Sequence, residues 1–281
     1  MKFKNKVVIV TGASVGVGEA CARFFAQEGA NVVLAARSEN IIGDLAVELT
    51  EGAPKSIESH SIAIKTDVAK LRDCECLIEQ TIAMFGRIDI LVNNAGYNAR
   101  GDVAECDLDS MDQIIDVNLK GPIRLTKLAL PHLLTSPKAA VINVASLAGR
   151  FPLEGEATYS CSKFGLRAFS LALAEELNET AVSVSLVSPG PIDTGFIMGH
   201  IEDVPDLVFS QPMSTAEDIA KAILACAEDG VRERAIPAAS GMLATAGYLM
   251  PTLRKVAKPL LLRTGAKAKK RYLKREQSKQ P

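Results

Sequence analysis

The chain begins with a short apolar run that leads directly into a glycine-rich turn and then into a helical pattern. The run from Lys6 to Val10 is apolar and β-branched, which predicts a buried strand. Residues 11–18 (Thr-Gly-Ala-Ser-Val-Gly-Val-Gly) form the turn, and the helical pattern ends at Gly29. Glycines let a backbone approach phosphate groups, and a helix N-terminus presents free N–H groups to them. This order therefore predicts a pyrophosphate site on a parallel α/β fold; a glycine turn with no ligand is the alternative.

The alternation of strands and helices continues along the chain. Seven apolar runs predict strands: Val7–Val10, Asn31–Ala35, Ser59–Lys65, Ile88–Val92, Ala139–Val144, Val182–Leu186 and Arg234–Ile236. Helical patterns lie near residues 16–29, 38–50, 70–86, 109–135, 157–179 and 216–229. Strands that are apolar on both faces belong to a parallel sheet that helices cover on both sides. We expect one doubly wound α/β domain over residues 1–237, with a mainly parallel seven-stranded sheet and ligands at the carboxyl ends of its strands.

Composition is consistent with a single globular domain. The 281 residues are 48% hydrophobic and carry a formal net charge of −1, which is typical of a chain with a sizeable core. The six cysteines are scattered, which favours reduced thiols, and the three histidines do not cluster, so we expect no metal site. No apolar signal segment precedes the first strand, and we expect a cytoplasmic protein.

Three polar residues in the second half of the chain suggest acid/base chemistry. Tyr159 and Lys163 are four residues apart in a predicted helix, and Ser146 lies thirteen residues before the tyrosine. Side chains at this spacing share one helix face. A free tyrosine titrates near ~10, so a neighbouring ammonium would favour the phenolate at neutral pH. An ordinary helix with a half-buried tyrosine and a solvated lysine shows the same spacing, so the interpretation depends on a redox cofactor.

Ordered motifs over about residues 4–237 resemble those of the short-chain dehydrogenase/reductase family. The turn at residues 11–18 is similar to the family's Thr-Gly-x-x-x-Gly-x-Gly cofactor loop. Residues 93–96 (Asn-Asn-Ala-Gly) match its motif after the fourth strand, and residues 189–194 (Pro-Gly-Pro-Ile-Asp-Thr) resemble the segment beside the nicotinamide. The resemblance implies a Rossmann-type fold, a homo-oligomer (dimer or tetramer) and hydride transfer to or from a small carbonyl or alcohol substrate.

The resemblance also implies the site residues. The catalytic tetrad would be Asn118, Ser146, Tyr159 and Lys163. The last two would also contact the cofactor, together with Gly12, Ser14, Val15, Gly16, Val17, Gly18, Arg37, Ser38, Asp67, Val68, Asn94, Ala95, Gly96, Pro189, Gly190, Ile192 and Thr194.

Each member of the tetrad has an expected role in carbonyl reduction. Tyr159 would donate a proton to the carbonyl oxygen, which Ser146 would also hydrogen-bond. Lys163 would lower the pKa of Tyr159 and hold the nicotinamide ribose. Asn118 would hold a water that links Lys163 to solvent. The alternative for Asn118 is a mid-helix polar residue that bonds to backbone at a local kink.

The end of the second predicted strand bears on the choice of cofactor. No acidic residue stands there to bind a ribose 2′-hydroxyl, whereas Arg37 can pair with a 2′-phosphate and Ser38 can add a hydrogen bond. NADP(H) is therefore favoured over NAD(H). Against this, Val15 occupies a loop position where NADP-using members of the family often carry Lys or Arg, and Arg37 as a solvated surface residue is the alternative.

Residues 195–214 correspond to the family's variable substrate lid. Seven apolar side chains in it suggest an apolar substrate, unless they pack on their own domain: Phe196, Ile197, Met198, Ile201, Leu207, Val208 and Phe209. We expect an apolar ketone or alcohol, whose identity stays open.

Residues 238–281 form an extension that departs from the family pattern. Residues 251–281 hold eleven Lys/Arg against one Glu, a net charge of +10 that leaves −11 on the first 250 residues. Apolar and basic residues interleave over 249–263, which suggests an amphipathic helix on an anionic membrane surface, although prolines and charges exclude a spanning segment. The alternatives are a lid or oligomer contact over 240–263 and a solvated tail beyond 265. Nucleic-acid binding is not expected, because the rest of the chain is acidic.

Two classes of function remain open. The favoured one is an NADP(H)-dependent oxidoreductase; the other is a non-catalytic nucleotide-sensing or scaffold protein on the same fold. The complete tetrad favours the enzyme. A family epimerase or dehydratase is less favoured, because its cofactor loop is spaced differently from residues 11–18.

Overall fold

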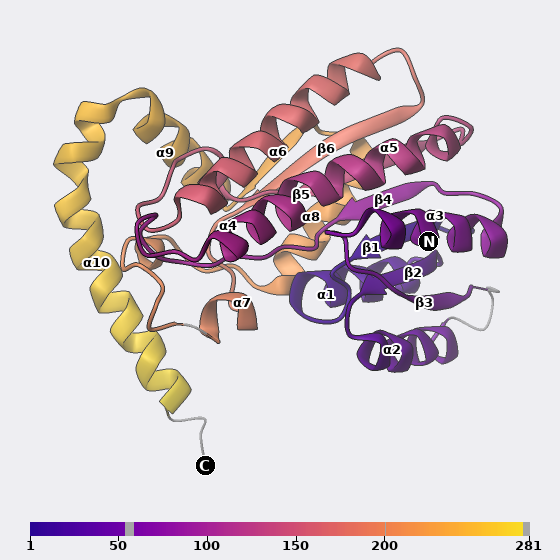
Figure 1. The fold of residues 1–281 in the computed structure, drawn as a ribbon, viewed down its shortest axis with the longest axis horizontal. Helices are drawn as coiled ribbons and strands as arrows, with labels where there is room; N and C mark the ends of the chain where they lie inside the picture. The colour runs from indigo at the N-terminus through magenta and orange to yellow at the C-terminus, as the bar shows by residue number, and fades with distance from the viewer. Residues whose placement is uncertain (54–58, 200, 278–281) are drawn as a thin grey trace.

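A single parallel sheet organises the chain. The computed structural model describes residues 1–53, 59–199 and 201–277. Its seven strands are ordered β3-β2-β1-β4-β5-β6-β7, and every neighbouring pair is parallel. Helices lie on both sides of the sheet (Figure 1). The doubly wound α/β fold expected from the sequence is confirmed.

The strands lie close to the predicted ranges. They are β1 (Val7–Thr11), β2 (Asn31–Ala36), β3 (Ser61–Lys65), β4 (Ile90–Asn93), β5 (Ala139–Val144), β6 (Val182–Pro189) and β7 (Glu233–Ile236). The helices of the described residues are α1 (Gly16–Gln27), α2 (Glu39–Glu51), α3 (Leu71–Phe85), α4 (Leu108–Ile115), α5 (Gly121–Leu133), α6 (Ala157–Glu176), α7 (Gly195–Met198), α8 (Ala216–Asp229), α9 (Ala238–Leu249) and α10 (Pro251–Gln277). Short turns of helix, η1 (Asp116–Lys120), η2 (Leu147–Gly149) and η3 (Val208–Ser210), complete the set.

Two hydrophobic cores enclose the sheet, one on each face. Phe25 of α1, Ile42 of α2 and Ile223 of α8 pack on one face. Leu77 of α3, Leu125 of α5 and Leu173 of α6 belong to the core on the other. Burial on both faces explains why the strands are continuously apolar rather than alternating.

The predicted helix over 109–135 is interrupted. It consists of α4 and α5 joined by η1, a single π-helical turn. Pro122 has no N–H group, so the backbone carbonyl of Asn118 lacks the donor that a regular α-helix supplies four residues further on. A π turn accommodates this loss and displaces the chain locally. The sequence pattern showed the helix but not its interruption.

The C-terminal helices α9 and α10 lie at the end of the molecule where the lid is found (Figure 1). Helix α9 packs closely on β7, since a Cβ on Gly241 would lie 2.2 Å from the Cβ of Ala235. Helix α10 packs on the segment that contains η3, where Ala268 joins a small core with Val204 and Phe209. A solvated tail beyond residue 265 is therefore wrong for the described residues up to 275; residues 278–281 lie outside them.

Three kinds of contact hold α10 to the lid and to the segment just before it. Lys269 Nζ donates hydrogen bonds to the carbonyls of Glu202 and Val204, at 2.8 and 2.7 Å. Arg275 pairs with Asp193 at 2.9 Å. The backbone contact is closest at Gly265, where a Cβ would lie 1.8 Å from the carbonyl oxygen of Asp206. Among the helices of the described residues, none combines the length and the apolarity that crossing a membrane requires.

Candidate active site

A cavity of about 750 Å³ opens at the carboxyl ends of the strands. Its walls come from the glycine turn, the ends of β2 and β4 to β6, the lid, and helices α9 and α10. Most of the predicted site residues line it: Gly12, Ser14, Val15, Gly16, Val17, Arg37, Ser38, Asp67, Val68, Asn94, Ala95, Gly96, Ser146, Tyr159, Lys163, Pro189, Gly190, Ile192 and Thr194. Of the predicted residues, Gly18 and Asn118 do not line it. The tertiary structure thus brings together motifs that are far apart in the sequence.

The glycine turn after β1 has a backbone conformation that other residues would strain. Gly12 and Gly16 have φ angles of 65° and 62°, in the left-handed region. Gly18 serves packing rather than ligand contact, because a Cβ there would lie 2.1 Å from the carbonyl oxygen of Gly12. The turn therefore needs glycine at these three positions for two separate reasons.

Two polar side chains tie the glycine turn to the end of β4. The hydroxyl of Thr11 accepts hydrogen bonds from the backbone N–H groups of Asn94 and Ala95, at 3.0 and 3.1 Å. The Asn94 side chain donates in return to the carbonyl of Thr11, at 3.0 Å. These bonds fix the cavity wall at the point where the strand order reverses, between β1 and β4.

The residues around the first turn of α1 suit a diphosphate. Val15 precedes the helix and has no polar atom with which to cap the N–H groups of the first turn. Ser14, Val15, Gly16 and Val17 line the cavity at this point. Free N–H groups and the positive end of the helix dipole favour an anion here.

The rim of the cavity near β2 carries a free positive charge. Arg37 is exposed and makes no ion pair with any residue that the structure describes. Ser38 lies beside it, and Asp67 and Val68 line the cavity beyond β3. An unpaired guanidinium at this rim suits a phosphate on the ribose of a dinucleotide.

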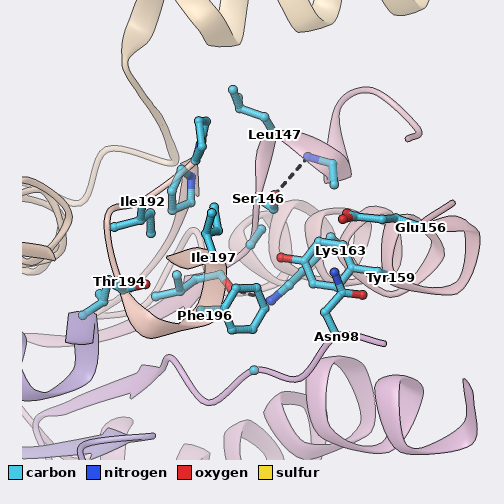
Figure 2. Close-up of a pocket in the computed structure, with 18 of the residues that line it drawn as sticks. Asn98, Ser146, Leu147, Glu156, Tyr159, Lys163, Ile192, Thr194, Phe196 and Ile197 are labelled. Carbon is cyan, nitrogen blue, oxygen red and sulfur yellow. Dashed lines mark hydrogen bonds between the residues drawn. The ribbon is translucent and has the colours of Figure 1, made fainter. Parts of the chain in front are cut away.

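Tyr159 is buried in the wall, with 9% of its surface exposed. Burial raises the pKa of its phenol above the ordinary value, and the charge of Glu156 raises it further. A hydrogen bond with Ser146 and the charge of Arg100 act in the opposite direction. Figure 2 shows Ser146, Tyr159 and Lys163 near one another in the cavity. The phenol therefore holds its proton at neutral pH.

Lys163 lies beside Tyr159 in the cavity wall and bonds to the backbone. Its ammonium donates a hydrogen bond to the carbonyl of Val144 at 3.0 Å and lies 5.7 Å from the centre of the Tyr159 ring. Burial lowers the pKa of Lys163 itself to about 8. Burial is the first cause of the shift in both groups: it raises the pKa of the phenol and lowers that of the ammonium.

Asn118 is fully buried behind the cavity wall. Its Oδ1 accepts a hydrogen bond from the N–H of Tyr97, and its Nδ2 donates to the carbonyl of Tyr97, both at 2.8 Å. Nδ2 also donates to the hydroxyl of Ser162 at 3.1 Å. The side chain thus bonds to backbone at a local kink, which is the alternative weighed for it from the sequence. Its backbone carbonyl faces Pro122, which has no N–H group to donate four residues further on.

Sequence reasoning missed several residues of the cavity. Arg100 and Glu156 form an ion pair at 2.9 Å, and their side chains are 12% and 5% exposed. Both line the cavity, as do six residues of the extension: Ser240, Leu243, Ala244, Gly247, Lys258 and Leu261. The pairing joins residues 56 positions apart, so no local pattern signals it. Residues 238–281 match no family motif, so the sequence offered a lid over 240–263 only as one alternative.

Comparisons with known proteins agree with this geometry. The family model described as short chain dehydrogenase matches residues 6–204. An uncharacterized oxidoreductase of Staphylococcus epidermidis is 35% identical over 198 residues, which cover 70% of this chain and 83% of the relative. The uncharacterized oxidoreductase YxnA of Bacillus subtilis is 34% identical over 259 residues, covering 90% of this chain and 71% of the relative.

A solved structure shows the same architecture. It is a metagenomic short-chain oxidoreductase in complex with NADP, with a TM-score of 0.70 and 29% sequence identity. The likeness covers 84% of this chain and 98% of the solved chain.

Proposed function

The chain belongs to the short-chain dehydrogenase family, and on that premise we propose that it is an NADP(H)-dependent oxidoreductase that interconverts a ketone and a secondary alcohol. One observation carries the proposal: a single cavity joins a glycine turn suited to a diphosphate with a buried, protonated phenol. The favoured substrate is apolar, because the lid and α9 add Phe196, Ile197 and Leu243 to the cavity wall.

The residues of the chain divide the chemistry among themselves. A bound nicotinamide would supply or accept the hydride. Tyr159, which holds its proton at neutral pH, donates it to the carbonyl oxygen during reduction and receives it back during oxidation. Ser146 hydrogen-bonds the same oxygen and orients it toward the phenol. Ser146 already caps η2 by accepting from the N–H of Ala148 at 3.1 Å, so its hydroxyl is held in position.

Lys163 and Asn118 are proposed as supporting residues. Lys163 is buried beside Tyr159, where its ammonium can bind ribose hydroxyls of the cofactor and supply positive charge as the phenol loses its proton. Asn118 positions the segment that carries Tyr97 and leaves its backbone carbonyl for a water in a proton route. In this proposal the backbone of Asn118, and not its side chain, holds the water.

NADP(H) is the cofactor we propose, in preference to NAD(H). Arg37 is free to pair with a 2′-phosphate. The solved relative with a TM-score of 0.70 is itself an NADP complex. Val15, which is 65% exposed, leaves the pocket without a second cation at the turn. Arg37 therefore carries the preference.

The test is reduction of a panel of apolar ketones, followed by the loss of NADPH absorbance. Tyr159→Phe should retain NADPH binding and lose nearly all turnover, because phenylalanine fills the same space but has no proton to donate. Turnover that survives in Tyr159→Phe would exclude Tyr159 as the acid/base. Tight NADPH binding by the wild type with no turnover on any ketone would favour the nucleotide-sensing alternative.

We also propose that helices α9 and α10 contact an anionic lipid surface. Exposed apolar side chains run from the end of α9 into α10: Met242, Tyr248, Leu249, Met250, Val256 and Leu260. Exposed basic residues follow on the remaining length of α10: Arg263, Lys267, Lys270, Arg271 and Lys274. Apolar insertion combined with basic contact to headgroups is typical of peripheral membrane helices.

A further inference from the structure

Three polar residues line the cavity beside Tyr159 and have no contact with the reacting oxygen in the proposed hydride transfer. Asn98 follows the Asn-Asn-Ala-Gly turn, Arg100 lies two residues later, and Glu156 immediately precedes α6. Figure 2 shows Asn98 and Glu156 close to Tyr159. Apart from Ser146 and Lys163, the wall near the phenol includes the apolar side chains of Leu153 and Phe196. Isolated polar groups in an apolar pocket fix the orientation of a ligand.

Arg100 and Glu156 compensate each other's charge. Arg100 Nε donates to Glu156 Oε1 at 2.9 Å, and the two side chains are 12% and 5% exposed. The Arg100 guanidinium also lies 5.9 Å from the centre of the Phe196 ring. A compensated pair attracts no ion strongly, but its carboxylate can still accept a hydrogen bond from a neutral group.

Asn98 has unused hydrogen-bonding capacity. Its Nδ2 and Oδ1 are both buried, and neither has a hydrogen-bond partner among the described residues. The amide lies near enough to Glu156 to offset part of the rise that burial causes in the pKa of that carboxyl, but the contact falls outside hydrogen-bond geometry. A buried amide without partners lowers the stability of the fold, and a ligand that supplies the partners recovers the loss.

We propose that Asn98, with the Arg100–Glu156 pair beside it, is a specificity subsite for a neutral hydroxyl group of the substrate. The inference rests on the proposed oxidoreductase function and narrows its substrate class to apolar ketones that carry a second hydroxyl, or the corresponding diols. A hydroxyl can accept from Nδ2 of Asn98 and donate either to its Oδ1 or to the Glu156 carboxylate. A charged substrate group, such as a carboxylate or an ammonium, would gain little here, because Arg100 and Glu156 already neutralise each other.

The experiment compares octan-2-one with hydroxyoctan-2-ones whose hydroxyl lies about one to four carbons from the carbonyl. The readout is the ratio of kcat/KM values, with NADPH, in the wild type and in Asn98→Leu, which keeps the side-chain size. At least one hydroxyketone should be preferred about tenfold or more by the wild type, and the ratio should fall toward unity in the variant.

Thermal unfolding separates a ligand-binding role from a structural one. Asn98→Leu removes an unpaired polar group, so its melting temperature should equal or exceed that of the wild type. Asn178→Leu, at an exposed asparagine after the end of α6, is the matched control and should keep the wild-type ratio. If Asn98→Leu does not fold, Asn98→Ser serves in its place.

Equal ratios in the wild type and Asn98→Leu, with both ketones reduced, would overturn the subsite and leave the oxidoreductase proposal standing. If neither ketone is reduced, that proposal fails instead, and the subsite is judged by ketone-induced thermal stabilisation in the presence of NADPH. Stronger stabilisation by a hydroxyketone that disappears in Asn98→Leu supports the subsite; equal stabilisation by both ketones overturns it.

Discussion

At the scale of single residues, Ser146 and Glu156 shift the pKa of the Tyr159 phenol in opposite directions. Burial and the Glu156 carboxylate raise the pKa of the phenol, whereas the Ser146 hydrogen bond lowers it. A raised pKa favours the protonated form, which is the proton donor in the ketone reduction that we propose. The same shift makes the phenolate scarce, so alcohol oxidation is expected to need a higher pH than reduction.

Glu156→Gln tests this balance. Loss of the negative charge lowers the pKa of Tyr159, and Arg100, no longer paired, lowers it further. The alkaline rise of kcat/KM for alcohol oxidation should therefore begin at lower pH in the variant. A pH–rate profile measures the shift, with Glu179→Gln on the surface as the control. A profile that moves to higher pH would contradict the sign assigned to Glu156.

Arg37 decides the cofactor preference in the proposed function. Arg37→Ala should lower the ratio of kcat/KM for NADPH to that for NADH by about tenfold or more, since a hydrogen bond to a charged group contributes about 1.5–3 kcal/mol. Steady-state kinetics with both cofactors checks this. An unchanged ratio would mean that Arg37 does not contact the cofactor and is a solvated surface residue.

At the scale of elements, the lid and α10 behave as one unit because their backbones meet at Gly265. A Cβ at this position would lie 1.8 Å from the carbonyl of Asp206, so contact this close requires glycine. Lys269 then bonds the carbonyls of Glu202 and Val204, which leaves the lid bound to a helix far away in the sequence. The position of α10 thereby influences the shape of the cavity.

Gly265→Ala should loosen this contact by about 1–3 kcal/mol, because the overpacked methyl group forces the two backbones apart. Hydrogen exchange over residues 201–210 should become faster. Gly43→Ala is the matched control: it lies within α2 with no atom within 4 Å of the new Cβ. That substitution should stabilise the protein by about 0.5–1 kcal/mol. Unchanged exchange in Gly265→Ala would mean that the lid does not depend on α10.

At the scale of the whole molecule, charge and apolar surface are unevenly distributed. Residues 251–281 carry a net charge of +10 and the first 250 residues −11. The inner side of α10 packs on the lid, while Val256 and Leu260 are 75% and 69% exposed. The cavity also reaches this region, through Leu243 and Leu261. A lipid surface at α9 and α10 would therefore adjoin the wall of the cavity that we propose for an apolar substrate.

Liposome co-sedimentation tests the lipid contact. Binding to vesicles with anionic lipid should exceed binding to neutral vesicles and should fall as salt increases, because screening weakens contacts between basic residues and headgroups. Val256→Asp with Leu260→Asp should abolish it, since both side chains are exposed and the fold does not depend on them. Equal pelleting with both vesicle types, or self-association through these residues in solution, would favour an oligomer contact.

Local sequence was sufficient to determine the fold and most of the candidate site. Apolar runs of strand length, glycines at 12, 16 and 18, and the spacing of Tyr159 and Lys163 are local patterns, and local patterns set strands, turns and helix faces. The π turn at Asn118 is partly local too, since it depends on Pro122.

Only the tertiary structure decided which distant groups share the cavity. The Arg100–Glu156 pair, the unpartnered amide of Asn98 and the union of α10 with the lid all join residues widely separated in the chain. The pKa values of Tyr159 and Lys163 likewise follow from burial, which depends on the complete fold. Desolvation and long-range contact exist only once the chain has folded, and for that reason the proposed substrate preference rests on the tertiary structure, whereas the proposed type of reaction rests on sequence motifs.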